Sequence, residues 1–231
     1  MAGLAGSLKT QGSCLSGLVM HEMIFIDNLG KNYGDLVALD GLSLQIPPGE
    51  IFGLLGPNGA GKTTTIKILT TLARPSRGTA RIHDFDVVRQ PLAVKKLIGV
   101  CPQEINLDRE LTAYENLWIY GRLRRMDDLA ARIAELLTFG NLEDRAHSLV
   151  REFSGGMQRR LLILRALVSR PRVLFLDEPT VGLDPQVRRQ LWNLIQSQFP
   201  DHFPNSSCPV VTNVSPYRAV RFSTFAHGSK F

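Results

Sequence analysis

The feature that most constrains this chain is a glycine-rich run between a short apolar segment and a helical one. Residues 56–63 read GPNGAGKT and fit the pattern G-x-x-x-x-G-K-[ST]. Residues 51–55 before them predict a strand, and residues 63–72 after them have apolar residues at helical spacing. In this context the pattern predicts a phosphate-binding loop, because inward-facing backbone N–H groups and the positive end of the helix both attract a phosphate.

Two side chains of this loop have specific predicted roles. Lys62 is expected to reach the β- and γ-phosphates of a nucleotide, and the Thr63 hydroxyl is expected to ligate Mg²⁺. A glycine-rich strand-to-helix turn with a chance lysine is the alternative. The other loop residues predicted to bind the nucleotide are Gly56, Asn58, Gly59, Ala60, Gly61 and Thr64.

An acidic pair ends another apolar run. Residues 173–176 read VLFL and predict a buried strand, which Asp177 and Glu178 follow. A carboxylate in this place beside a phosphate-binding loop can hold the metal, which makes Asp177 a predicted Mg²⁺ ligand. Glu178 is then placed to polarise a water for attack on the γ-phosphate and is the predicted catalytic residue. An acidic pair that only caps the strand is the alternative.

A second glycine-containing segment, FSGGMQ at residues 153–158, lies at the start of a helical pattern. The Ser154 hydroxyl and the amides of Gly155 and Gly156 predict a second anion-binding helix end. A flexible helix cap is the alternative. One chain rarely needs two such ends for one nucleotide, so we expect a second copy of the protein to supply one of them.

The remaining patterns indicate how the chain is organised. Strands are predicted at residues 24–26, 42–46, 79–82 and 98–101, and helices at residues 112–123, 129–137 and 156–168. The middle of the chain, about residues 104–166, is therefore rich in helices and flanked by strand-and-helix segments. We expect an α/β core with an inserted helical subdomain.

Composition excludes several classes of protein. No apolar stretch approaches the roughly 18 to 20 residues of a spanning helix, so the chain is not expected to cross a bilayer. Three widely separated cysteines without C-x-x-C spacing argue against a disulfide framework and a zinc site, and suit a reducing cytosol. The formal net charge is +6, but basic pairs such as Arg159–Arg160 are predicted to lie on solvated helix faces. Charge therefore does not identify a partner.

Both ends of the chain differ from its centre. Residues 1–22 are rich in glycine and serine and are expected to be a disordered extension or a misassigned start. Residues 199–231 contain four prolines and no sustained periodicity, so they are predicted to be an atypical, non-native tail without further strands. The domain is expected to cover residues 23–198.

Three segments in order resemble the nucleotide-binding subunit of an ABC transporter: GPNGAGKTT (56–64), FSGGMQRR (153–160) and VLFLDEPTVGLDP (173–185). FSGGM and TVGLDP are similar to the drug- and lipid-export branch that includes daunorubicin-resistance-type ATPases. The resemblance implies a P-loop NTPase (RecA-like) core with the inserted helical subdomain and a small N-terminal antiparallel β-subdomain.

The same resemblance implies functional roles. Tyr33 would stack on adenine, Gln103 would be the Q-loop residue and a Mg²⁺ ligand, and Asp184 would lie in the D-loop. Two subunits would pair head to tail, with ATP and Mg²⁺ as cofactors, and hydrolysis would drive export through a separate membrane permease from the cytoplasmic face of the plasma membrane. No nucleic acid partner is expected. The phosphate loop of one subunit would face Ser154, Gly155, Gly156 and Met157 of the other.

The chain departs from the family at one position. The family places a switch histidine at the end of a strand about thirty residues after the catalytic glutamate. Residues 207–211 contain none, while His202 is too early and His227 too late. A frameshift or truncation near Gln198 is our hypothesis for this departure, and the ATPase activity is expected to be impaired.

Two alternatives remain beside the transporter ATPase. One is a nucleotide-binding remnant with little or no ATPase activity. The other is a soluble ABC ATPase acting on nucleic acid or ribosomes, although the chain has neither a long coiled-coil insertion nor a tandem second ATPase domain. The transported molecule is not specified by this sequence.

Overall fold

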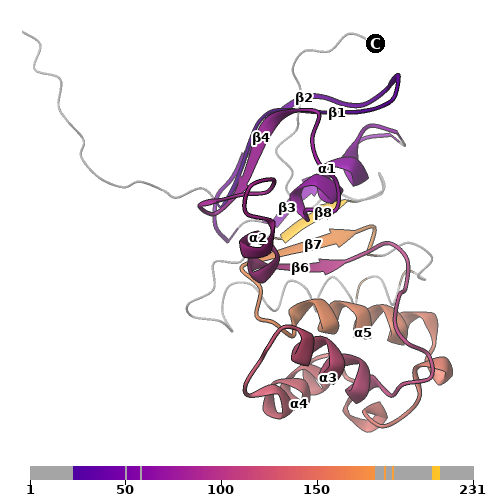
Figure 1. Cartoon of the computed structure of the whole chain (residues 1–231). Helices are drawn as coiled ribbons and strands as arrows, with labels where there is room; N and C mark the ends of the chain where they lie inside the picture. Colours follow the sequence, from indigo (N-terminus) through magenta and orange to yellow (C-terminus); the bar gives the residue numbers. More distant parts are fainter. Residues whose placement is uncertain are drawn as a thin grey trace, which may run out of the picture.

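The computed structural model describes residues 23–49, 51–57, 59–179, 185, 189 and 210–213. These residues form an antiparallel sheet, a parallel sheet and a group of helices. Figure 1 shows the antiparallel sheet at one end, the helices α3, α4 and α5 at the other, and the parallel sheet between them. The arrangement confirms the predicted α/β fold with helices inserted in the middle of the chain.

The antiparallel sheet has the strand order β2-β1-β4-β5. Its strands are β1 (Ile24–Tyr33), β2 (Leu36–Ile46), β4 (Arg77–Ile82) and β5 (Phe85–Asp86). β1 and β2 are longer than the sequence predicted, because their outer halves lack a regular apolar alternation. A tight turn joins them at Gly34, whose φ of 57° suits glycine.

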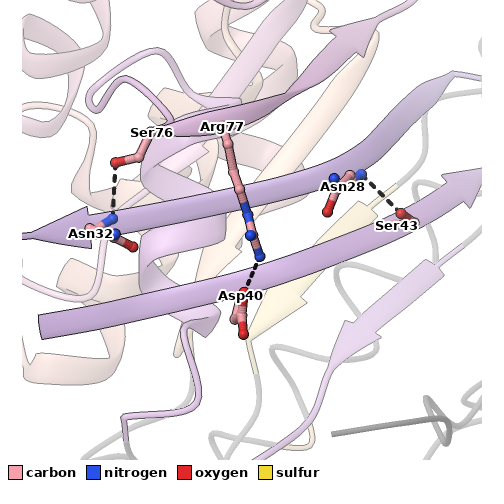
Figure 2. A network of polar contacts seen from close by, with 6 residues as sticks. All are labelled: Asn28, Asn32, Asp40, Ser43, Ser76 and Arg77. Atoms are coloured by element: carbon pink, nitrogen blue, oxygen red, sulfur yellow. Dashed lines mark hydrogen bonds and ion pairs between the residues drawn. The ribbon is translucent and has the colours of Figure 1, made fainter.

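Polar contacts hold these outer halves together where the strand register shifts (Figure 2). The backbone N–H of Asn28 donates to Ser43 Oγ at 2.9 Å, and that of Asn32 donates to Ser76 Oγ at 3.0 Å. Arg77 of β4 forms an ion pair with Asp40 of β2 across β1. Side chains thus replace the backbone pairing that the bulges disrupt.

The parallel sheet has the order β3-β8-β7-β6. Its strands are β3 (Ile51–Leu54), β8 (Val210–Asn213), β7 (Val173–Asp177) and β6 (Ile98–Cys101). The register pairs Asn213 with both Leu54 and Asp177. The strand ends therefore meet at one edge, which is where α/β sheets bind ligands.

Strand β8 corrects the prediction that residues 199–231 contain no further strand. A strand between two parallel neighbours needs no apolar–polar alternation, so a four-residue strand among prolines gave no periodic signal. The rest of that segment, residues 1–22 and the hypothesis of a frameshift near Gln198 lie outside the described residues.

Two helices pack near the sheets. Helix α1 (Lys62–Leu69) follows the glycine-rich loop as predicted, and contacts both β2 and β7. Helix α2 (Pro91–Leu97) was not predicted; its seven residues are too few for a clear period, but Pro91 occupies the first turn, where its fixed φ suits a helix start.

The inserted subdomain consists of α3 (Ala113–Leu123), α4 (Leu129–Phe139) and α5 (Gly155–Leu167), with the short helices η1 (Glu143–Arg145) and η2 (Val150–Glu152). Helix α3 begins with a capping box: Thr112 Oγ1 accepts from the Glu115 N–H at 3.1 Å, and the Glu115 carboxylate accepts from the Thr112 N–H at 2.8 Å. The part of the chain that the structure describes contains no helix with the length and apolar character needed to span a membrane.

Strand β7 separates two apolar cores, which explains why its first four residues are all apolar. Val173 and Phe175 pack with β1, β4 and α1, while Leu174 and Leu176 pack with the inserted helices. This division follows from the alternation of side chains along a strand. The end of β7 is consequently a fixed point on which a functional site can be built.

Candidate functional site

The glycine-rich loop links β3 to α1 in a conformation that requires glycine. Gly59 and Gly61 have φ values of 84° and 82°. A Cβ at Gly61 would lie only 2.6 Å from the carbonyl oxygen of Ala38 on β2. The loop is therefore packed closely against the antiparallel sheet, and α1 begins directly after it, with Gly61 as the N-cap residue, which makes no side-chain cap hydrogen bond.

Lys62 crosses the opening of this loop. Its half-buried ammonium donates to the carbonyl oxygens of Gly56 and Pro57, each at 2.8 Å. These contacts hold the positive charge over the loop, beside the positive end of α1. The loop, the helix end and the ammonium together form an environment that favours an anion.

A cleft of about 580 Å³ opens beside the loop. It brings together residues from the β1–β2 turn, the loop, α1 and two distant segments. Eight residues named from the sequence line it: Tyr33, Gly59, Gly61, Lys62, Thr63, Thr64, Gln103 and Glu178. Three further lining residues, Leu36, Val37 and Ala38, were missed, because nothing in the pattern of β2 distinguishes them from other strand residues.

Other predicted residues have a different place. Gly56 contacts Lys62 but does not line the cleft, and Ala60 is exposed on the loop. Asn58 and Asp184 lie outside the described residues. Their predicted roles in nucleotide binding and in the D-loop therefore stay predictions.

The acidic pair lies at the carboxyl end of β7. Asp177 ends the strand and is only 8% exposed, while Glu178 follows it with a φ of 46°, an unusual conformation for a residue other than glycine. The side-chain amide of Gln103 donates to Glu178 Oε2 at 3.1 Å. This hydrogen bond joins two segments 75 positions apart and orients the carboxylate at the cleft.

Arg159 supports this pair from α5 and was missed. The sequence predicted a solvated helix face at Arg159–Arg160, but Arg159 is only 3% exposed. Its guanidinium donates to the backbone carbonyls of Pro102, Gln103 and Glu178 at 2.9, 3.0 and 3.2 Å. The helical pattern gave no signal for this role, because the partners belong to loops distant in sequence.

The oxygen donors at the cleft fit Mg²⁺. The Thr63 hydroxyl and the Gln103 amide line it, while Asp177 precedes Glu178 at the end of β7 and is not among the residues that line the cleft. Mg²⁺ prefers such hard oxygen ligands and commonly takes the rest from water and phosphate. The described residues contain no group of three or more His, Cys, Asp or Glu that could form a self-sufficient metal cage. The donor set therefore suits a metal that arrives with a phosphate ligand.

The second predicted anion-binding end has the expected local structure. Ser154 caps α5, with its Oγ accepting from the Met157 N–H at 3.3 Å, and both Ser154 and Gly155 are exposed. In the described part of the chain, none of the four residues Ser154–Met157 lines the cleft that holds Lys62. The two predicted anion-binding ends of one chain thus lie on separate surfaces.

A glycine-rich loop between a parallel strand and a helix, with an acidic pair on a nearby parallel strand, defines a P-loop nucleotide-binding domain. A family model described as ABC transporter matches residues 39–181. The chain belongs to the ABC transporter family, as the three sequence segments indicated.

Individual relatives and structures agree with this family. The Nod factor export ATP-binding protein I of Paraburkholderia xenovorans strain LB400 is 47% identical over 176 residues, which are 75% of this chain and 58% of that protein. The daunorubicin resistance ATP-binding protein DrrA3 of Streptomyces coeruleorubidus is 46% identical over 176 residues, 75% of this chain and 56% of that protein. The chain thus spans little more than half the length of these curated relatives.

A solved structure shares the fold over most of the chain. The dimeric structure of a post-hydrolysis state of an ATP-binding cassette bound to ADP and Pi has a TM-score of 0.72 and 27% sequence identity. The similarity covers 83% of this chain and 88% of that one. The expected P-loop fold with inserted helices is therefore confirmed.

Proposed function

We propose that this chain is the ATP-binding subunit of an ABC exporter and that it hydrolyses ATP with Mg²⁺ at a head-to-tail dimer interface. The observation that carries the proposal is the single cleft that unites Lys62, Thr63, Gln103 and Glu178. A phosphate-binding lysine, a metal-binding hydroxyl and an oriented carboxylate are the parts that phosphoryl transfer to water requires. The names of the export relatives support the direction of transport.

The nucleotide would lie along the cleft from the β1–β2 turn to Glu178. Tyr33 is 48% exposed at that turn and lines the cleft, so its ring can stack on a base. Leu36 and Val37, also exposed, add apolar surface beside it. The N–H groups of the loop and of the first turn of α1 would surround the phosphates, with Lys62 supplying the charge.

The catalytic assignment follows from the position of each oxygen and amide. Glu178 would accept a proton from the attacking water, and Gln103 would hold that carboxylate in place through the 3.1 Å hydrogen bond. Thr63, Gln103 and Asp177 would hold Mg²⁺, which, when bound, neutralises charge on the β- and γ-phosphate oxygens. The protein contributes mainly position and electrostatics, as is usual for phosphoryl transfer.

Two copies would complete each site. The cap formed by Ser154, Gly155, Gly156 and Met157 lies outside its own cleft, and Ser154 and Gly155 are exposed, so the cap is available to a nucleotide held by a partner. A head-to-tail pair with twofold symmetry would place each cap opposite the other copy's loop.

A mixing experiment tests this shared site. Lys62→Ala removes the phosphate-binding charge, and Ser154→Asp keeps a good helix cap while placing a negative charge opposite the phosphates. Each variant alone is expected to lose turnover. Mixed one to one, they should recover activity at roughly a quarter of the sites, because random exchange makes half the dimers mixed and each mixed dimer has one complete site.

The control is a mixture of Lys62→Ala with the double variant Lys62→Ala, Ser154→Asp, in which no site is complete and no recovery is expected. ATP turnover of each mixture is the measurement. If the first mixture stays as inactive as the control although subunits exchange, Lys62 and Ser154 do not serve one site from two chains, and the proposal is wrong.

A membrane permease would contact the inserted helices. Four large apolar side chains are exposed there: Ile105 (41%), Trp118 (43%), Ile119 (42%) and Leu123 (77%). Ile119 and Leu123 share a face of α3. Ile105 lies two residues after Gln103, so a partner that binds Ile105 would contact the segment that carries Gln103. This contact would hold the subunit at the inner face of the plasma membrane.

A second candidate is a subunit that binds ATP but hydrolyses it slowly. Strand β8 favours it, because this next described strand after Glu178 ends at Asn213, two residues beyond the range 207–211, and the family pattern expects a histidine at the end of such a strand. Position 213 pairs with Asp177 in the register and therefore lies at the edge of the sheet that carries the site.

We expect Asn213→His to raise kcat by about tenfold or more, because an imidazole can stabilise charge that develops during hydrolysis. Steady-state ATP turnover of the wild type, Asn213→His and Asn213→Ala checks this. Fast turnover of the wild type, together with no gain from histidine, would exclude the slow candidate.

A further inference from the structure

The buried guanidinium of Arg159 contacts two parts of the site that are far apart in the sequence. It lies on α5, five residues after Ser154, and its partners are in the segment around Gln103 and at Glu178. Arg159 is 97% buried, and burying its charge costs free energy unless hydrogen bonds compensate. The three backbone carbonyls supply them.

Two of the three carbonyls that Arg159 binds belong to Gln103 and Glu178, the residues whose side chains meet in the cleft. Gln103 donates to Glu178 at 3.1 Å, and Arg159 holds the backbone of both residues from the other side. Glu178 has a φ of 46°, a conformation that persists only where the surroundings hold it. The guanidinium therefore sets the distance between the carboxylate and the amide that orients it.

Arginine suits this task better than lysine. Its planar fork presents several donors in fixed directions, so one side chain can bind carbonyls of two segments at once, whereas a lysine ammonium is a single flexible charge. Nη1 binds Pro102, and Nη2 binds both Gln103 and Glu178. The rigid helix α5 carries this fork about 7.5 Å along its axis from the cap formed by Ser154.

We propose that Arg159 is a positioning residue that couples the helix cap at Ser154 to the Gln103–Glu178 pair. Contact between this cap and a nucleotide would change the relative position of Gln103 and Glu178. The inference rests on the proposed function, in which that cap faces the nucleotide of a second copy. A shift of α5 caused by that contact would move the Arg159 guanidinium and, with it, the backbone of Gln103 and Glu178. The position of the Glu178 carboxylate in each chain would thereby depend on whether the Ser154 cap of that chain contacts the nucleotide of the other copy.

The test compares Arg159→Lys with Arg160→Lys. Arg160 is the adjacent arginine on the same helix, but it donates to the carbonyl of Gly140 at 3.0 Å and does not contact the site. For Arg159→Lys we expect kcat to fall by about 10- to 100-fold, because small misplacements of catalytic groups have effects of this size. KM and the Kd for MgATP should change little, and Arg160→Lys should keep wild-type kcat.

One further measurement and one further variant keep the outcome decisive. Hydrogen exchange without nucleotide should increase at the amides of residues 103–104 and 177–178 in Arg159→Lys but not in Arg160→Lys. This tests whether Arg159 holds the two segments together even if the protein is not an ATPase. Arg159→Gln, which keeps some donors, replaces the lysine variant if that variant fails to fold. Equal kcat for the two lysine variants, or a fall in kcat matched by a loss of MgATP affinity, would overturn the inference.

Failure of the underlying function has a different signature. If the wild type neither binds nor hydrolyses MgATP, the proposed function is wrong whatever the exchange data show. If the wild type hydrolyses ATP and Arg159→Lys does so at the same rate, only the positioning role is wrong.

Discussion

Replacing Glu178 with Gln is expected to lower ATP turnover by about 10²- to 10⁴-fold, the usual effect of losing a general base. The amide has nearly the same shape as the carboxylate and can still accept the hydrogen bond from Gln103, which is 3.1 Å long in the wild type. It cannot accept a proton from water. Binding of MgATP should therefore persist while the chemical step fails.

Turnover and nucleotide affinity, measured on the same preparation, separate these two effects. Glu143→Gln is a matched control, because Glu143 is an exposed acidic residue of η1 that does not line the cleft. Wild-type turnover in Glu178→Gln would remove Glu178 from the mechanism. A remnant without hydrolytic activity would show no difference between the variant and an already inactive wild type.

Replacing Lys62 with Ala is expected to weaken MgATP binding by about 10²-fold or more. Hydrogen bonds that involve a charged group contribute about 1.5–3 kcal/mol each, and tenfold in affinity corresponds to about 1.4 kcal/mol. The variant also leaves the carbonyls of Gly56 and Pro57 without their 2.8 Å donor, so the loop itself loses order. Both changes act in the same direction.

Equilibrium binding of MgATP in a Glu178→Gln background measures this effect without turnover. Lys67→Ala is the control, since Lys67 is an exposed lysine in the last turn of the same helix. A loss of affinity common to both lysine variants would indicate a general electrostatic effect and would contradict a specific role for Lys62.

Much of the site was predictable because its signals are local. The loop at residues 56–63 needs glycine where φ is positive, and this requirement leaves a recognisable run in the sequence. The acidic pair was predictable because it comes directly after four apolar residues of β7, which are buried on both faces of the sheet. Gln103 was identified through the family resemblance, and the cleft confirms that it lies with Glu178.

The unpredicted parts depend on contacts between distant segments. Arg159 looks like one arginine of a basic pair, and only the fold brings carbonyls of Pro102 and Glu178 to it. Strand β8 has no alternating pattern, because its neighbours β3 and β7 rather than solvent determine which side chains suit it. Tertiary contacts of this kind leave no period along the chain.

The position of β8 also affects how the protein is made. Leu54 and Asp177 do not pair with each other, since residues 210–213 lie between their strands. During synthesis, the edges of β3 and β7 that pair with β8 stay unpaired until Asn213 has been translated. Counted from Asp177, this takes about two to seven seconds at 5–20 residues per second. Open edges invite pairing with other chains during that interval, so we expect chaperones to act at this stage of synthesis.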